Sequence, residues 1–208
     1  MVCASATGFY GDRGGEVLDE QSGPGTGFLP EVCQAWEAAA APARQCGIRV
    51  VHLRLGIVLA RHGGALAGML PAFRLGLGAR LGGGNQYWSW IALEDVVRVV
   101  ELALKDDGLS GAVNTVAPEA TTNAAFTHGL ARALRRPAFL ALPAFAVIAL
   151  FGQMGREALL ASARVRPERL LKMGFKHRFP DLDAAFNHIL AGNNRTNHDQ
   201  AAKAWDTR

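Results

Sequence analysis

Hydrophobic positions along this chain form three short runs separated by stretches of helical periodicity. Residues 1–6 are apolar without alternation, residues 48–55 are rich in β-branched side chains, and residues 112–116 (AVNTV) are predicted to be another buried strand. Such runs are typical of strands that a parallel sheet buries on both faces. A helical stretch over residues 31–44, frayed by Pro42, lies between the first two runs. The order strand, helix, strand predicts a right-handed βαβ unit.

The rest of the chain is predicted to be mainly helical. Apolar residues recur at helical spacing in four segments, over residues 66–75, 94–104, 122–134 and 181–190. Thr122 and Asp181 have side chains that cap helix N-termini, and each stands at the start of its segment. Residues 12–30 are rich in Gly, Pro and acidic residues and are predicted to be a loop, whereas residues 88–91 are predicted to be extended.

Two classes of partner are disfavoured by the sequence. The longest apolar run, residues 138–152, contains Pro143 and is too short to span a bilayer, so we predict a buried helix there and no membrane partner. The chain has 22 basic and 18 acidic residues, and its 18 arginines are spread along the sequence. Because nucleic-acid-binding proteins carry a basic stripe or patch, we predict no nucleic-acid partner.

Cysteine and histidine positions limit the chemistry further. Cys3, Cys33 and Cys46 are odd in number, lack C-x-x-C spacing and follow no signal peptide, which predicts a reducing, cytoplasmic location. His52 and His62 stand alone without metal-ligand spacing, so no metal site is predicted.

The first apolar run raises a question about its surroundings. Residues 1–6 have the composition of a central strand, yet no segment precedes them to pair with the second edge. An unpaired apolar edge strand promotes aggregation, and folded proteins avoid leaving one open. We expect either that another segment covers this edge or that the chain is a truncated form of a longer protein.

A series of motifs resembles one known family in sequence order. The motifs are at residues 4–11, 36–37, 53–59, 63–66, 71–78, 84–91, 114–118 and 174–182. Together they resemble the extended short-chain dehydrogenases/reductases, and among these the YfcH-like branch of sugar-nucleotide epimerases. The resemblance covers about residues 2–190.

The resemblance implies an α/β fold, with a Rossmann-like parallel sheet and a small helical C-terminal domain on the substrate side. Residues 1–136 would form a partial Rossmann-like epimerase domain with a substrate-side insertion at 62–91, and residues 137–190 the helical domain. Residues 191–208 are polar and aperiodic and are predicted to be a disordered tail. The family's biochemistry implies NADP or NAD as cofactor and redox chemistry on a small-molecule substrate, a sugar nucleotide.

The chain departs from the family pattern where the cofactor would be bound and used. It has no G-x-x-G-x-x-G turn to hold the pyrophosphate, so cofactor binding would need a further N-terminal half of roughly 100 residues. The family's Tyr/Lys pair, aligned through Glu37, falls on Leu29 and Cys33, and Ala92 replaces the usual His. The standard acid–base chemistry is therefore unsupported.

Candidate catalytic residues follow the first strand, at the end where open α/β sheets bind ligands. Ser5, Thr7 and Tyr10 have hydroxyl groups suited to bonding a substrate oxygen. The alternatives are ordinary turn formation for Ser5 and Thr7 and core packing for Tyr10. Cys33 is expected to be a buried small hydrophobic residue rather than a nucleophile.

Candidate binding residues follow the second strand and flank a Gly-rich turn. The resemblance places contacts to the nicotinamide at Leu55, Gly56, Ile57 and Val58. Gly56 would permit a close approach. Flat aromatic faces suit sugars, so the candidate substrate residues are Arg80, Gln86, Trp88 and Trp90. A hydrophobic seam between two subdomains is the alternative for this last group, and Arg54 is expected to pair internally.

Three functional hypotheses follow. The first is an NAD(P)-dependent oxidoreductase or epimerase acting on a sugar nucleotide. The loss of the Tyr/Lys pair favours instead a non-catalytic module that binds a nucleotide or a partner. The open sheet edge suggests a third possibility, which is self-association or pairing with a separately encoded N-terminal half.

Overall fold

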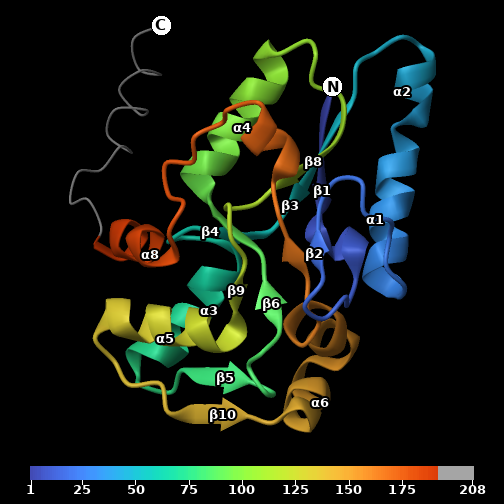
Figure 1. Ribbon diagram of the computed structural model, residues 1–208. Coiled ribbons are helices and arrows are strands. Elements are labelled where there is room, and N and C mark those ends of the chain that lie inside the picture. Colours follow the sequence, from blue (N-terminus) through green and yellow to red (C-terminus); the bar gives the residue numbers. More distant parts are fainter. Residues whose placement is uncertain (192–208) are drawn as a thin grey trace, which may run out of the picture.

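The computed structural model describes residues 1–191 and has an α/β architecture built on a parallel sheet (Figure 1). The sheet has the order β1 (Val2–Ala6), β3 (Val51–Leu55) and β8 (Gly111–Thr115). All pairs are parallel, with Val2 aligned to Val51 and Val51 to Gly111. β1 and β3 fall within the first two apolar runs of the sequence, and β8 begins one residue before the third, so the predicted parallel sheet is confirmed. In the described part of the chain, β1 is an edge strand paired only with β3.

Two helices connect β1 to β3, where the sequence predicted one. These are α1 (Phe28–Ala39) and α2 (Ala41–Gln45). The predicted start of the helix was wrong by three residues. The break falls at Ala40 because Pro42, in the first turn of α2, has no N–H to continue the hydrogen-bond ladder of α1.

One face of the sheet is covered by α4 (Leu93–Lys105). Val99 and Ala103 of this helix are buried in one cluster with Val51 and Val113 of the sheet. The helix agrees with the predicted segment within one residue at each end, because its apolar positions recur at helical spacing.

Short strands connect the sheet to the rest of the molecule. The predicted loop over residues 12–30 contains β2 (Val17–Leu18), and η1 (Thr7–Tyr10) precedes it. β2 pairs with β11 (Arg164–Val165), which brings the C-terminal part against the loop. The predicted extended segment is confirmed and belongs to two pairs, which are β4 (Ile57–Leu59) with β7 (Trp90–Ala92) and β6 (Tyr87–Trp88) with β9 (Thr121–Thr122).

A second region, here called the lobe, lies at the end of the molecule opposite α4 (Figure 1). The lobe comprises α3 (Gly64–Arg74), β5 (Ala79–Leu81), α5 (Asn123–Leu134), β10 (Leu140–Leu142) and α6 (Ala144–Met154). Its interior contains Phe126, whose ring makes edge contacts with Trp88 and Phe186. Thr122 caps α5 as predicted, since its hydroxyl accepts a hydrogen bond from the Ala125 N–H at 3.2 Å.

The predicted buried helix over residues 138–152 was wrong. The segment forms β10 and α6, and Val147 is the one residue of α6 that is buried, whereas Phe139 is 91% and Phe145 76% exposed. Hydrophobicity predicts burial only where a second layer covers the element, and in the described chain no element covers the outer side of α6. None of the described helices is long and apolar enough to cross a membrane.

The chain continues through η2 (Gly155–Leu159) and α7 (Glu168–Lys172) to α8 (Leu182–Ala191). Asp181 caps α8 as predicted, with its carboxylate accepting from the Ala184 N–H at 2.9 Å. The division of the chain at residue 137 stays a prediction. The predicted disordered tail lies outside the described residues, apart from Ala191 at the end of α8.

Candidate functional site

A cavity of about 250 Å³ lies at the carboxyl ends of β1 and β3. Parallel α/β sheets bind ligands at this edge. The cavity is lined by η1, the N-terminal half of α1, the β3–β4 junction, β6 and the segment 157–163. We call it the strand-end pocket. Its walls come from five separate parts of the sequence, which only the fold brings together.

The strand-end pocket contains five of the predicted site residues and leaves out six. Lining it are Thr7, Leu55, Gly56, Ile57 and Trp88. Outside it are Ser5, Tyr10, Val58, Arg80, Gln86 and Trp90. Three of the four predicted cofactor contacts and one predicted catalytic hydroxyl therefore line the same pocket, whereas three of the four predicted substrate residues lie outside it.

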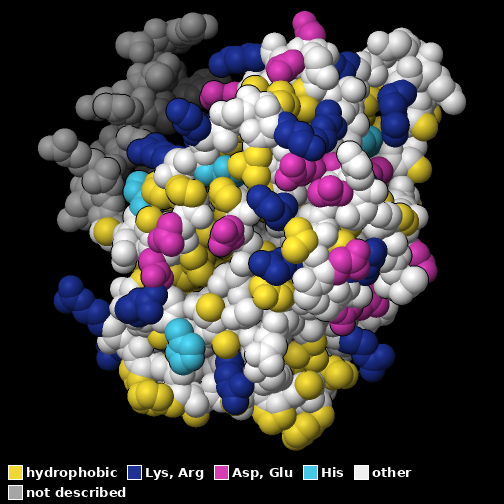
Figure 2. All heavy atoms as spheres, in the orientation of Figure 1, with side chains coloured by type: hydrophobic (Ala, Val, Ile, Leu, Met, Phe, Trp, Pro, Cys, Tyr) yellow, Lys and Arg dark blue, Asp and Glu magenta, His cyan; other side chains and the backbone are white. Residues whose placement is uncertain are grey.

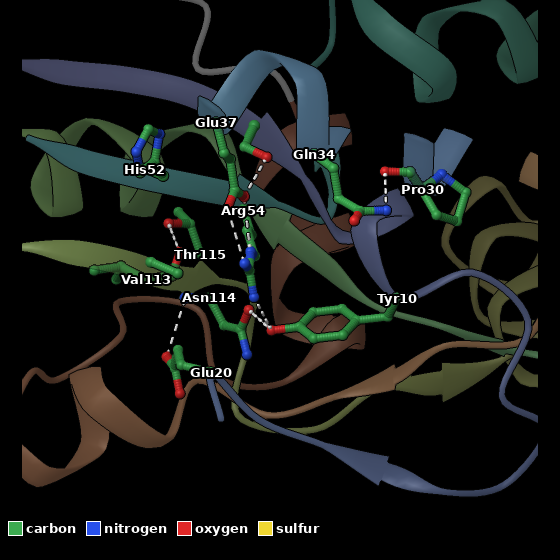
Figure 3. A network of polar contacts seen from close by, with 12 residues as sticks. Tyr10, Glu20, Pro30, Gln34, Glu37, His52, Arg54, Val113, Asn114 and Thr115 are labelled. Atoms are coloured by element: carbon green, nitrogen blue, oxygen red, sulfur yellow. Dashed lines mark hydrogen bonds and ion pairs between the residues drawn. The ribbon is translucent and has the colours of Figure 1, made fainter. Parts of the chain in front are cut away.

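Tyr10 is in the interior of the protein and not at the pocket (Figure 3). Its side chain is completely buried, and its hydroxyl donates to Asn114 Oδ1 at 2.7 Å while Arg54 donates to it at 3.0 Å. Burial raises the pKa of the phenol. This geometry does not fit the predicted catalytic role, and core packing, the alternative, describes the observed position.

Ser5 is also turned away from the pocket. It is buried, and its hydroxyl donates to Glu37 Oε1 at 2.8 Å. The same carboxylate accepts from Arg54 Nε at 2.8 Å and Nη2 at 2.9 Å, which is a bidentate pair. Burial by itself would raise the pKa of Glu37, but the hydrogen bonds from Arg54 and Ser5 outweigh it and lower this pKa. The internal pairing expected for Arg54 is confirmed.

Two further members of this buried network were missed from the sequence. Asn114 on β8 accepts from Tyr10, and its side-chain amide donates to the Arg166 carbonyl at 3.0 Å. Glu20, from the loop before α1, accepts the Asn114 backbone N–H at 3.0 Å. Burial raises the pKa of Glu20. A polar residue inside an apolar strand was the available sequence signal for Asn114, whereas nothing in the sequence pointed to Glu20.

The close approach at Gly56 is made by the protein's own backbone. A Cβ atom at this position would lie 2.6 Å from the Ser89 carbonyl oxygen and 2.9 Å from Val116. The Gly56 N–H donates to the Thr115 carbonyl and the Ile57 N–H donates to Ser89, so both amides are already bonded. Gly56 is therefore required for packing β4 against its neighbours. A ligand at this wall would meet side chains and carbonyl groups.

The pocket wall provided by α1 is apolar. Leu29 and Cys33, one helical turn apart, both line it. Burial raises the pKa of the Cys33 thiol, which keeps it protonated and a weak nucleophile. The two positions at which the family pattern has a phenol and an ammonium thus present a hydrocarbon and a neutral thiol.

Glu157 is the carboxylate that borders the strand-end pocket, and it was not found from the sequence. Its Oε2 accepts the Leu29 N–H at 2.8 Å, and its Oε1 accepts from Gln153 at 2.7 Å. The hydrogen bond from the Leu29 N–H lowers the pKa of Glu157, so the group is ionised at neutral pH. It joins the segment after α6 to the first turn of α1, where the helix dipole favours a negative charge.

The predicted substrate residues have mainly structural contacts. Arg80 is exposed and donates to the Gly83 carbonyl at 3.0 Å, and Gln86 donates to the carbonyls of Leu81 and Leu159. Trp90 is buried in the hydrophobic core, and Trp88 is buried except where it lines the pocket. The seam between the sheet and the lobe, the alternative interpretation, describes the two tryptophans.

A parallel sheet with a pocket at its strand ends, bordered by a C-terminal segment, is a Rossmann-like α/β arrangement that is also found in solved structures of epimerase family proteins. Residues 142–189 match the family model described as "Domain of unknown function (DUF1731)". The chain is 46% identical over 188 residues to the epimerase family protein Mb2239 of Mycobacterium bovis. That alignment covers 90% of this chain and 62% of the Mycobacterium protein.

Two solved structures share the fold. The human epimerase family protein SDR39U1, crystallised with NADPH, has a TM-score of 0.84 and 35% identity over 92% of this chain and 65% of its own. The nucleoside-diphosphate sugar epimerase of Corynebacterium glutamicum has a TM-score of 0.75 and 36% identity over 98% of this chain and 40% of its own.

The chain is therefore a homologue of the epimerase family proteins, and the resemblance identified from the motifs is confirmed. It spans about three-fifths of the length of such curated relatives, 62% for the Mycobacterium bovis protein.

Proposed function

We propose that this chain forms the substrate side of an NAD(P)-dependent oxidoreductase or epimerase that acts on a sugar nucleotide. The observation that carries the proposal is the strand-end pocket, which gathers Thr7, Trp88 and residues 55–57 at the ligand-binding edge of the sheet. The NADPH in the human relative's crystal structure supports the choice of cofactor class.

The pocket residues fit one end of such a cofactor. The apolar side chains of Leu29, Leu55 and Ile57 suit a flat ring, and the volume of about 250 Å³ is below the roughly 300–1,000 Å³ typical of complete small-molecule sites. The chain has no glycine-rich turn for the phosphates. We therefore propose that these residues contact the nicotinamide end alone. The proposal does not distinguish NADP from NAD.

Residue roles follow from the geometry. A bound nicotinamide would exchange a hydride with a sugar carbon. Of the three predicted catalytic residues, only Thr7 lines the pocket, and its hydroxyl is suited to holding a substrate hydroxyl group. Leu29, Cys33 and Trp88 exclude water from this space. The cytoplasmic location predicted from the cysteines remains part of the proposal.

Ligand binding tests the proposal directly. NADPH, NADH, nicotinamide mononucleotide and UDP-glucose are titrated into the chain, with tryptophan fluorescence and ligand-observed NMR as readouts. Ala158 borders the pocket and is exposed, so Ala158→Trp should block binding without disturbing the core. Ala39→Trp, at an exposed position of α1 outside the pocket, is the matched control. The same titration is repeated on the chain joined to the cofactor-binding N-terminal half of a relative. Absence of binding for all four ligands there would refute the proposal.

A second function, a non-catalytic binding module, is favoured by one observation. Leu29 and Cys33 face the pocket where acid–base groups would be needed, and the thiol is neutral. NADPH deuterated at the hydride position separates the two functions. Transfer of deuterium to a sugar nucleotide, detected by mass spectrometry, would exclude the binding module, and binding without transfer would support it.

Self-association through the sheet edge is a further proposal, supported by the one-sided pairing of β1. A second strand added to this edge would complete its backbone hydrogen bonds. Analytical ultracentrifugation tests it, since a monodisperse monomer at high concentration would exclude the contact.

A further inference from the structure

The outer side of the lobe exposes a large apolar surface. It is formed by side chains of the α3–β5 loop, of the residue before β10 and of α6, namely Leu75, Phe139, Phe145, Leu150, Phe151 and Met154, and we call it the α6 surface. Four of these side chains, Leu75, Phe139, Phe145 and Leu150, are between 69% and 91% exposed. Exposed apolar patches of this kind mark interaction sites, since single proteins in solution rarely expose them.

The contributing segments are neighbours in space. β5 and β10 pair through Arg80 and Ala141, and α6 follows β10 directly. Gly76, beside Leu75, packs against the ring of Pro137, which brings the α3–β5 loop next to Phe139. Figure 2 shows hydrophobic side chains gathered at this end of the molecule.

The segments that form the lobe carry arginines but no acidic side chains. Residues 61–91 and 120–156 contain seven arginines and no Asp or Glu, although the chain has 18 acidic residues. The lowest part of the view in Figure 2 accordingly shows blue and yellow side chains without magenta. Six of these arginines are exposed and form no ion pair within the described residues, namely Arg61, Arg74, Arg80, Arg135, Arg136 and Arg156.

These two properties together select the partner. A second copy of the lobe would place arginines against arginines, and like charges across an interface cost several kcal/mol. A nucleic acid would match the charge but leave Leu150 and Met154 in water. A lipid surface with anionic headgroups matches both properties, because apolar side chains enter the acyl region while the arginines contact the headgroups.

From this match we infer that the α6 surface docks the protein onto anionic membranes as a peripheral contact. Phe139 and Phe145 enter the interface, and Arg135 and Arg136 contact the lipid headgroups. This peripheral contact does not cross the bilayer, consistent with the absence of a membrane-crossing helix among the described residues. The sequence predicted no membrane partner because the apolar run at residues 138–152 is too short to span a bilayer. That prediction did not consider whether the run is exposed.

Vesicle flotation tests the inference, using phosphatidylcholine vesicles with and without about 30% phosphatidylserine. The chain should float with the anionic vesicles and be released at about 0.5 M salt, because ions screen the headgroup attraction. Arg135→Gln with Arg136→Gln should weaken binding roughly tenfold or more, since each basic residue near such a surface contributes about 1 kcal/mol. Phe139→Ser with Phe145→Ser should abolish flotation.

A matched control uses exposed apolar residues of α4. Val97→Ser with Leu104→Ser removes side chains that are 50% and 63% exposed on the opposite side, and vesicle binding should be unchanged. Circular dichroism confirms that each variant is folded, and the arginine variants test the inference without changing any apolar side chain.

Three results of the binding experiments would overturn the inference, and so would one result on the oligomeric state. These are no flotation, equal flotation with neutral and anionic vesicles, or tighter binding to a duplex oligonucleotide than to vesicles. A dimer in ultracentrifugation that Phe139→Ser with Phe145→Ser dissociates would likewise assign the surface to a second copy.

Discussion

The interior beside the sheet and the outside of the lobe reverse the usual placement of polar and apolar groups. Between β1, β3 and β8 the protein buries Tyr10, Arg54 and Asn114, and each has hydrogen-bond partners (Figure 3). On the lobe it exposes Phe139 and Phe145 to solvent. Buried polar groups are tolerated because they are bonded, whereas exposed aromatic residues gain nothing in the isolated chain. Whether a side chain is polar or apolar therefore does not by itself decide whether it stabilises this protein.

The largest effect expected is within the lobe itself. Phe126→Ala should destabilise the protein by about 4 kcal/mol, because it leaves a cavity between Trp88 and Phe186. Phe145→Ala, on the exposed side of the lobe, should change the free energy of unfolding by less than about 0.5 kcal/mol. Urea denaturation measures both. Similar losses for the two variants would contradict the exposure of α6.

Breaking the buried ion pair of Arg54 with Glu37 should have the next largest effect on stability. Arg54→Met should cost about 3 kcal/mol, since it leaves the Glu37 carboxylate and the Tyr10 hydroxyl without their charged donor. Adding Glu37→Met should recover at least about 1 kcal/mol, because the uncompensated charge is then removed.

Arg80→Met is the control for this pair, since Arg80 is exposed on the lobe and its guanidinium bonds, among residues 1–191, only to the Gly83 carbonyl. Its unfolding free energy should equal that of the parent chain. If Arg80→Met lowers the free energy of unfolding as much as Arg54→Met, the buried network around Arg54 does not stabilise the protein more than an exposed arginine does.

A smaller effect is expected from acidification. Burial lowers the pKa of His52, which lies beside Glu37, Arg44 and Arg54, and of His177, which lies beside Asp95 and Arg98. Below about pH 6.5 the unfolded chain therefore binds protons that the folded chain excludes, and stability falls as pH falls. The slope cannot exceed about 1.4 kcal/mol per pH unit for each histidine.

Denaturation at pH 7.5 and pH 5.5 measures this loss. His52→Gln should reduce the difference between the two pH values, because one of the two groups no longer titrates. An unchanged difference would show that His52 takes up its proton equally in both states. The Glu37 carboxylate acts at lower pH, since its lowered pKa makes its stabilisation disappear only as pH falls below about 4.5.

The smallest effect is at the start of α5. Thr122→Ala should cost about 1 kcal/mol through loss of the N-cap hydrogen bond to Ala125. Thr121→Ala, one residue earlier and outside the cap, is the control and should be nearly neutral. Thermal unfolding that ranks the two in the opposite order would reject the cap.

The local elements were largely predictable, because local chemistry decides them. The apolar runs became β1, β3 and β8, and Thr122 and Asp181 capped the helices that they precede. The family resemblance, aligned through Glu37, placed Leu29 and Cys33 where the Tyr/Lys pair is expected, and positions four apart share one helix face.

Assignments that depend on where a side chain points in the folded protein were not predictable from the sequence. Ser5 and Thr7 are two residues apart, yet Thr7 borders the pocket and Ser5 bonds Glu37, because η1 begins directly after β1 and turns the chain. Glu157 reaches α1 across 128 residues of sequence. No local pattern encodes such a contact.

The sequence by itself determined the buried character of the three strands and the helix caps, since each depends on residues close together in the chain. Tertiary structure alone decided that Tyr10 is internal, that Gly56 serves packing, and that the apolar segment of α6 faces outward. It also gathered arginines that are dispersed in the sequence onto one acid-free lobe. The physical reason is that burial and charge clustering depend on which elements pack together, and that packing is a property of the whole fold.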